Sequence, residues 1–295
     1  MLLNWLGALP GAAAQGLVWG IMAIGVYITY KILDVADLTV DGSICTGGAV
    51  CAVLMTAGVN VWVALLVALV CGMLSGLLTG LFHTLMGIPA ILSGILTQLI
   101  LWSVNLKIMG KANLPLSARQ LPSIVTQSRI GASLVILGIF VLLIAAFLYW
   151  FFGTELGASL RATGSNLNMS RAQGINTNFT KVLGLALSNG IVALSGALLA
   201  QYQGFSDVSM GRGAIVIGLA AVVIGDAIMS KITTQFYFTL LGVVIGAIVY
   251  WLVYQTVIFL GLDADLLKML SALVVAVFLA VPYWRTTYFS QKKEV

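Results

Sequence analysis

Long apolar stretches without a charged residue limit most strongly what this chain can fold into. The longest covers 42–106, and the others cover 1–30, 130–154, 182–206, 232–262 and 269–284. About 20 apolar residues in a helix cross the roughly 30 Å hydrocarbon core of a membrane. Only 8% of the residues are charged and the mean hydropathy is +1.10, whereas soluble domains have about 25% charged residues. The chain is therefore an integral membrane protein.

The apolar stretches divide into nine candidate spans. The stretch 42–106 is cut at Gly58-Val59-Asn60 and again between His83 and Pro89, because Gly, Asn and Pro interrupt helices. The segments lack the alternating pattern of a membrane β-barrel. We therefore predict an all-α, polytopic membrane protein with about nine transmembrane helices. The predicted spans are 11–33, 42–58, 60–83, 88–106, 130–152, 181–203, 213–230, 233–260 and 265–284.

Several classes of chemistry are disfavoured by the motifs that the sequence lacks. It contains no G-x-x-x-x-G-K-[ST] phosphate loop, no H-E-x-x-H and no Cys/His ligand set. There is one histidine, and the three cysteines fall inside predicted spans. We expect no catalytic residue, no metal ligand and no cofactor in this chain, and no nucleic-acid partner. An intramembrane enzyme would need a nucleophile and a base on facing helices, and no pair suggests itself.

A polar loop at 153–181 interrupts the apolar pattern. It reads GTELGASLRATGSNLNMSRAQGINTNFTK, with two spaced arginines, capping residues, and Gly164 and Gly174 at turn positions. This composition predicts a short amphipathic helix on the membrane face. On these residues alone, the helix is either a plain connector or a docking element.

The loop resembles a loop of bacterial ABC-import permeases of the ribose and branched-chain amino-acid class. The family pattern is approximately G-x-x-x-R-A-x-G-x-N-x-x-x-A-x-x-x-G-I-N, and Ser170-Arg171-Ala172 matches it loosely. The resemblance implies a cytoplasmic coupling helix docked in a groove of a separate ATPase. The residues expected to take part in coupling are Glu155, Gly157, Arg161, Gly164, Asn166, Arg171, Gly174, Ile175 and Asn176.

The segment 37–43, DLTVDGS, places two carboxylates between apolar runs. It resembles the D-L-S-V-G-S segment between pore-lining helices of ribose-type permeases, with Asp41 inserted. The stretch 215–228 likewise resembles the family's A-A-V-V-L-G-G segment. Within the family, the form with the inserted acid is most similar to tryptophan or tyrosine importers. A charged residue at a helix centre costs about 2.5–3.5 kcal/mol, so we predict a helix break, capped by Asp37 or Thr39 and relaxed at Gly42.

The sequence also contains a weak internal repeat. A shift of 170 residues lays 20–40 over 190–210 and aligns Asp37-Leu38-Thr39-Val40 with Asp207-Val208-Ser209-Met210. Two such units that enter the membrane in opposite directions form an inverted repeat, which places transit sites at broken helices. The side chains of the two breaks either cap helices, contact the solute, or do both. The expected pathway residues are Asp37, Thr39, Asp41, Gly42, Ser43, Asp207 and Ser209.

The repeat divides one permease domain that spans residues 1–295. We expect repeat one at about 9–107, and an outer loop, a linking span and the coupling loop at 107–180. Repeat two then covers about 181–284 and a cytoplasmic tail 285–295. Nine spans put the N-terminus outside and leave a small majority of the basic residues inside, and re-entrant segments at 42–58 and 213–230 would enlarge that majority. A cytoplasmic coupling loop selects the nine-span arrangement.

Together these observations predict the permease subunit of an ABC importer in the bacterial cell membrane. The implied partners are a second permease copy, two ABC ATPase subunits that hold ATP and magnesium, and an extracytoplasmic solute-binding protein. An aromatic amino acid is the first choice of solute, with sugars, nucleosides and branched-chain amino acids open. The alternative is an ion-coupled secondary carrier or channel that uses Asp37, Asp41 and Asp207.

Overall fold

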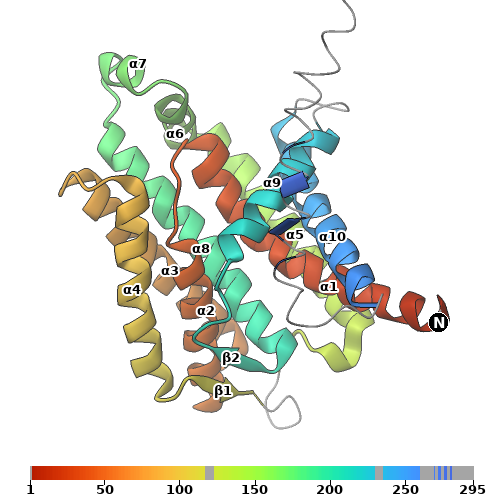
Figure 1. Cartoon of the computed structure of the whole chain (residues 1–295). Coiled ribbons are helices and arrows are strands. Elements are labelled where there is room, and N and C mark those ends of the chain that lie inside the picture. Colours follow the sequence, from red (N-terminus) through yellow and green to blue (C-terminus); the bar gives the residue numbers. More distant parts are fainter. Residues whose placement is uncertain are drawn as a thin grey trace, which may run out of the picture.

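The computed structural model describes residues 2–116, 123–229 and 235–259, together with isolated helical positions between 269 and 280. Helices make up almost all of it (Figure 1). The elements are α1 (Leu2–Tyr27), η1 (Ile28–Ile32), α2 (Val40–Thr56), α3 (Val61–Thr84), α4 (Ala90–Met109), β1 (Asn113–Pro115), η2 (Gln127–Arg129), α5 (Ile130–Gly153), α6 (Glu155–Ser165), α7 (Leu167–Ala172), α8 (Thr177–Gln203), β2 (Phe205–Asp207), α9 (Ala214–Met229) and α10 (Phe236–Phe259).

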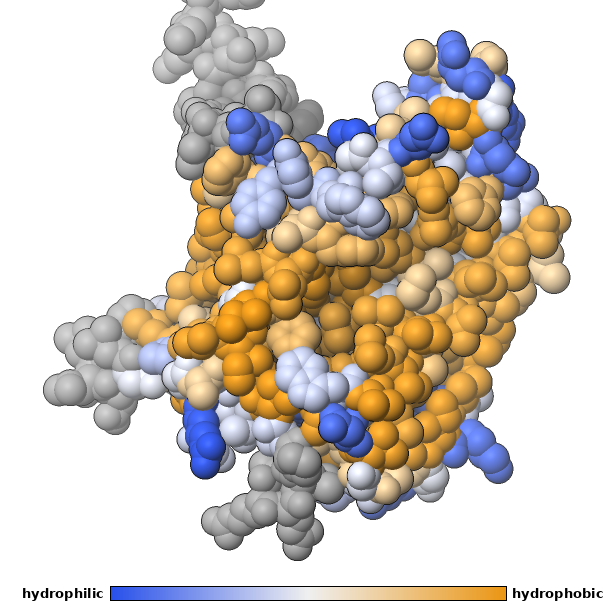
Figure 2. Space-filling view, turned by 180° about the vertical axis from the view of Figure 1, so that it is seen from behind, coloured by the Kyte–Doolittle hydropathy of each residue, from blue (hydrophilic) through white to orange (hydrophobic). Residues whose placement is uncertain are grey.

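Six helical segments within the described residues are long and apolar enough to cross a membrane. They are Gly7–Ile32, Val61–Thr84, Ala90–Met109, Gln127–Gly153, Thr177–Gln203 and Phe236–Phe259. Figure 2 shows the corresponding surface, a broad apolar band with polar residues gathered at its two ends. This distribution is the one expected of a multi-pass membrane protein.

Two predicted spans, 42–58 and 213–230, correspond to α2 and α9, which are shorter than the six membrane-crossing segments. α2 has 17 residues and α9 has 16, so each is about 25 Å long. Each follows a segment without α-helix, at 33–39 and 204–213. The predicted ninth span, 265–284, lies largely outside the described residues, as does the tail 285–295. The all-α prediction also missed one short antiparallel ladder, in which β1 pairs with β2.

The centre of the molecule is packed through small residues. α1 and α8 are the most buried of the long helices, and they run antiparallel, since the Ser188 hydroxyl donates to Gly25 O and the Ser195 hydroxyl donates to Val18 O, each at 2.7 Å. A side chain added at Gly47 would overlap the backbone of Ala193 on α8. Such close approach is how helices associate in lipid, where burial from water provides no driving force.

The two ends of the helical layer carry different elements. α6 and α7 lie together at one end, close to the end of η1, and the β1–β2 ladder lies at the opposite end (Figure 1). The segment 33–39 leads from the α6 end back into the interior, where α2 begins. We refer below to the coupling end, at α6 and α7, and the ladder end, at β1 and β2.

Candidate functional site

The first helix break begins where α1 widens into the π-helical turn η1. The Val35 amide donates to Thr29 O at 2.9 Å, and Asp34 has a φ of +54°, which reverses the chain. The Asp37 carboxylate then accepts the Thr39 amide at 2.9 Å. This side-chain turn ends where α2 begins, so the predicted break is present. The N-cap residue of α2 is Thr39, whose side chain makes no capping bond.

Asp37 also anchors a buried polar network. It is 2% exposed and accepts the Asn189 side-chain amide of α8 at 2.6 Å. The Asn189 carbonyl accepts the Ser43 hydroxyl at 2.6 Å, and Ser43 shares a second hydrogen bond of 2.7 Å with Ser75 of α3. The network therefore ties the break and α2 to α8 and α3. Among the described residues, no Lys or Arg forms an ion pair with Asp37.

A second arm of hydroxyl groups extends from Thr39. Thr39 and Thr79 share a hydrogen bond of 2.7 Å, and the Thr79 hydroxyl donates to Thr97 of α4 at 2.9 Å. All three side chains are buried. The sequence prediction missed Ser75, Thr79, Thr97 and Asn189. A usable signal was the four-residue spacing of Ser75 and Thr79, which places both hydroxyls on one helix face.

Asp41, the inserted acid, lies outside that network. Its carboxylate accepts the amides of Gly213 at 3.0 Å and Ile215 at 2.9 Å, at the start of α9. From the first turn of α2, Asp41 therefore caps the short helix that follows the second break. Gly42, beside it, lets α2 approach Gln98 and Leu101 of α4 closely.

The second break, 204–213, repeats the turn of the first. The Asp207 carboxylate accepts the Ser209 amide at 2.7 Å and also the Ser209 hydroxyl. Asn113 of β1 donates its side-chain amide to Asp207 at 3.2 Å, next to the ladder register Asn113–Asp207. Burial raises the pKa of Asp207, but the bonds from Ser209 and Asn113 and the charge of Arg212 outweigh it and hold the pKa below its usual value.

The residues predicted for coupling mainly shape the loop that contains them. The Asn166 side chain accepts the Met169 amide at 3.0 Å and caps α7, and Asn176 accepts the Phe179 amide at 3.1 Å and caps α8. Gly174 has a φ of +81°, which glycine adopts at little cost. The Ile175 amide donates to Ser170 O, and the Arg171 guanidinium donates to the Thr177 hydroxyl at 3.1 Å.

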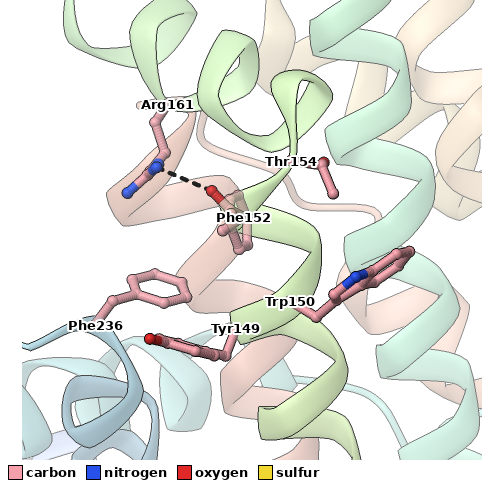
Figure 3. A pocket seen from close by; sticks show the side chains of 7 residues that line it. Tyr149, Trp150, Phe152, Thr154, Arg161 and Phe236 are labelled. Atoms are coloured by element: carbon pink, nitrogen blue, oxygen red, sulfur yellow. Dashed lines mark hydrogen bonds between the residues drawn. The ribbon is translucent and has the colours of Figure 1, made fainter.

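Gly157, Gly164 and Arg161, which were also predicted for coupling, connect the loop to α5 and η1. Side chains at Gly157 and Gly164 would overlap the backbone at Phe151 and at Ile32, respectively. The Arg161 guanidinium donates to Phe152 O at 2.9 Å, which caps the end of α5 (Figure 3). It borders an open cavity of about 400 Å³ with Tyr149, Trp150 and Phe236. Arg161 thus turns toward the helical layer.

The outer surface of the coupling end carries exposed apolar side chains. Leu156 is 49% exposed, Met169 62% and Phe179 52%, and Glu155 is exposed beside them. Exposed apolar groups beyond the ends of membrane helices are typical of protein contact surfaces. Six of the nine residues predicted for coupling are exposed as well, so both sets are accessible to a partner. No group of three or more His, Cys, Asp or Glu in the described part of the chain forms a metal site.

Comparison with known proteins assigns the chain to a family. The family of branched-chain amino acid transport system permease components matches residues 9–282. The chain belongs to this family. It is a permease of the ABC-transporter class and a multi-pass protein of the bacterial inner membrane, as the resemblance in the coupling loop implied.

Curated relatives cover most of the chain. It is 41% identical over 267 residues to a tyrosine transport system permease protein of Clostridioides difficile, a match that covers 90% of this chain and 88% of that one. It is 28% identical over 197 residues to the autoinducer 2 import system permease protein LsrC of Salmonella paratyphi B, which covers 63% and 55% of the two chains. The expected similarity to tryptophan or tyrosine importers is confirmed by the first relative.

A solved structure shares the fold. PsaBC from Streptococcus pneumoniae, in complex with Fab, superposes with a TM-score of 0.54 over 99% of this chain and 100% of that one, at 14% sequence identity. At that identity the likeness concerns the fold alone.

Proposed function

We propose that this chain is the membrane-spanning subunit of an ABC importer, which forms the path of a small solute, an aromatic or other amino acid, and is driven by a separate ATPase. Two permease copies, two ATPase subunits with ATP and magnesium, and an extracytoplasmic solute-binding protein make up the working assembly. The family match over 9–282 is the observation that carries the proposal. The tyrosine transport relative supports an aromatic amino acid as the solute.

The arrangement of the two breaks supports an inverted repeat. α1 leads into the break at 33–39 and then into α2, and α8 leads into the break at 204–213 and then into α9. α1 and α8 run in opposite directions, and both breaks form the same turn with an aspartate accepting the amide two residues later. Inverted repeats place transit near such broken helices. Repeats at about 9–107 and 181–284, and about nine spans in all, fit this order.

Both breaks give the pathway a means of rearrangement. A broken helix can tilt about its non-helical segment while the packed helices beside it stay intact. In the conformation described here, Asp37, Thr39 and Ser43 are buried and satisfied by neighbouring side chains. In this state these side chains hold the first break and α2 against α3 and α8, and contact with solute would follow only when α2 moves relative to α8.

The coupling end is proposed to face the cytoplasm and bind the ATPase. α6 contacts η1, which directly precedes the first break, and a side chain at Gly164 would overlap the backbone of Ile32. A displacement of α6 would therefore be transmitted to the first break through the close contact between Gly164 and Ile32. ATP-driven closure of the ATPase dimer would move the coupling ends of both permease copies.

The decisive experiment combines association and transport. The purified chain is reconstituted with its ATPase and binding protein, and ATP-driven uptake of L-tyrosine is measured for Met169→Asp and for Lys111→Asp as the matched control. Both positions are exposed, but at opposite ends. Met169→Asp should lower ATPase affinity and uptake by about tenfold, the value of roughly 1.4 kcal/mol of lost contact.

Two results would contradict the proposal. One is equal ATPase binding by the two variants, which would remove α7 from the interface. The other is uptake by the chain alone, driven by an ion gradient in the absence of ATPase. The second result would favour the alternative of an ion-coupled carrier that uses Asp37, Asp41 and Asp207. The supporting observation is the buried carboxylate of Asp37, which forms no ion pair among the described residues.

A further inference from the structure

A cavity walled by aromatic rings lies between α1, α9 and α10, apart from the coupling loop. It has a volume of about 470 Å³ and is lined by Trp19, Met210, Arg212, Tyr250, Trp251 and Tyr254, among others. We call it the aromatic cavity. Small-molecule sites in proteins have volumes of about 300–1,000 Å³ and mostly apolar walls with a few polar groups. The aromatic cavity has this size and composition.

The rings of the cavity form one connected cluster. Trp251 has its centroid 5.7 Å from that of Trp19 and 5.0 Å from that of Tyr254. Both contacts are tilted or edge-on, as aromatic pairs prefer. The cluster therefore presents a firm aromatic wall, on which a further planar ring can pack in the same manner.

Two hydrogen-bond donors in this wall have no partner in the described part of the chain. The indole nitrogens of Trp19 and Trp251 are both buried and unpaired, and Trp19 is 6% exposed. A buried indole N–H usually finds an acceptor, because leaving it unpaired costs about 1–3 kcal/mol. Both tryptophans line the aromatic cavity, so an acceptor that binds there is a candidate partner for these donors.

The third donor is Arg212, which borders the same cavity. Its guanidinium lies 4.9 Å from the centroid of the Trp102 ring, a cation–π contact that restrains the arginine. The cavity lining contains no Asp or Glu in the described residues. Its polar groups therefore favour an anion, and a carboxylate supplies the acceptor oxygens that two indoles and a guanidinium can share.

We propose that the aromatic cavity binds a planar aromatic molecule that carries a carboxylate, with its ring against Trp251 and Tyr254 and its carboxylate on Arg212 and the indole N–H groups. This inference deepens the proposed function and rests on it in one respect, that the ligand is the transported solute. Arg212 belongs to the second break, and α1 carries Trp19 toward the first. A ligand in the cavity would therefore contact the segments that must move.

The test is direct binding by the whole chain in lipid nanodiscs, measured by titration calorimetry without ATPase or binding protein. The probes are L-tyrosine, tyramine, which lacks the carboxylate, and L-leucine, which lacks the ring. L-tyrosine should bind, and tyramine and L-leucine should bind at least about tenfold more weakly, because each loses a charge-assisted bond or a ring contact worth ~1.5 kcal/mol.

Conservative variants locate the site. Arg212→Gln should weaken L-tyrosine binding by about tenfold or more, and Trp251→Phe, which keeps an aromatic ring, though a smaller one, and removes the N–H, by about threefold to tenfold. Arg129→Gln and Trp62→Phe are the matched controls, since both residues are exposed and away from the cavity, and neither should change binding.

The outcomes separate this inference from the proposed function. Equal binding of the three probes, or L-tyrosine binding that is unchanged in Arg212→Gln and Trp251→Phe, overturns the aromatic cavity as the site even if ATP-driven uptake works. A lipid that copurifies with the chain and is lost in Arg212→Gln, with no binding of L-tyrosine, also overturns it. Binding as predicted, without ATP-driven uptake, leaves the site intact and contradicts the permease proposal.

Discussion

The two helix breaks have the same local chemistry in different surroundings. In each, an aspartate accepts the amide of the residue two positions later and the side-chain amide of an asparagine from another element. Asp37 and its partner Asn189 are buried in the centre, whereas Asp207 and Asn113 lie at the ladder end, partly open to solvent. The same turn is therefore buried among helices at the first break and partly exposed to solvent at the second.

Burial determines how much free energy is lost when a polar group is deprived of its hydrogen-bond partner. A buried donor or acceptor that loses its partner costs about 1–3 kcal/mol, whereas water replaces the partner of an exposed one. Matched substitutions at the two breaks therefore test whether the same change costs more unfolding free energy at the buried break than at the exposed one.

The largest contrast is expected for the aspartates themselves. Asp37→Ala should lower the free energy of unfolding in detergent micelles by about 2–4 kcal/mol, because it strands the Thr39 amide and the Asn189 side chain in the interior. Asp207→Ala should lower it by about 1 kcal/mol or less, because water reaches the freed donors. Equal losses, or an Asp37→Ala protein as stable as the wild type, would remove the distinction.

The asparagine partners give the next contrast. Asn189→Ala should cost about 1–3 kcal/mol of unfolding free energy, since Asp37 and Ser43 both lose their partner. Asn113→Ala should stay within about 0.5 kcal/mol, as is usual at surfaces. Denaturant titrations of both variants check this, and a greater loss for Asn113→Ala would reverse the comparison.

The hydroxyl groups beside each aspartate give a smaller contrast. Thr39→Val keeps the shape but removes a buried hydroxyl that bonds Thr79, so we expect a loss of about 1 kcal/mol. Ser209→Ala, which keeps the Ser209 amide on Asp207, should cost less than about 0.5 kcal/mol. Melting temperatures of the two variants rank them, and the opposite ranking is the unfavourable outcome.

The smallest effect concerns acid. The folded state holds the pKa of Asp207 below its usual value, so this carboxylate contributes stability above its unfolded pKa of about 3.9. That contribution is lost as the pH falls through the lowered folded value. The unfolding midpoints of wild type and Asp207→Asn should therefore converge at low pH. A difference that stays constant down to strong acid would show that the carboxylate charge contributes nothing.

Local turns and caps were predictable from the sequence because their chemistry is local. Asp37, Gly42 and Asp207 signalled the breaks, and Asn166 and Asn176 stand where helices begin. The predicted spans 42–58 and 213–230 coincide with α2 and α9 to within two residues at each end. The apolar runs did not specify the backbone of the segments before these helices, 33–39 and 204–213, because an extended apolar segment and a helical one have the same composition.

Partners far apart in the chain were harder to predict. Asn189 is a single amide in a long apolar helix, and nothing around it shows that it meets Asp37, 152 residues away. Asp41 looked like part of the first break, yet it caps the start of α9. Arg161 belongs to the loop that matches the family pattern, but its side chain bonds to Phe152 O, at the end of α5 in the same chain. Long-range pairing depends on how the helices pack, which periodicity does not specify.

In the proposed orientation, the α6–α7 end faces the cytoplasm and the ladder end faces outward. The most direct test labels single cysteines in intact cells with a membrane-impermeant maleimide, after Cys45, Cys51 and Cys71 are replaced by alanine. Asn168→Cys lies on exposed α7, and Lys111→Cys is exposed at the ladder end. We predict that Lys111→Cys reacts in intact cells and that Asn168→Cys reacts only after permeabilisation. Labelling of Asn168→Cys in intact cells would place α7 outside and contradict coupling to a cytoplasmic ATPase.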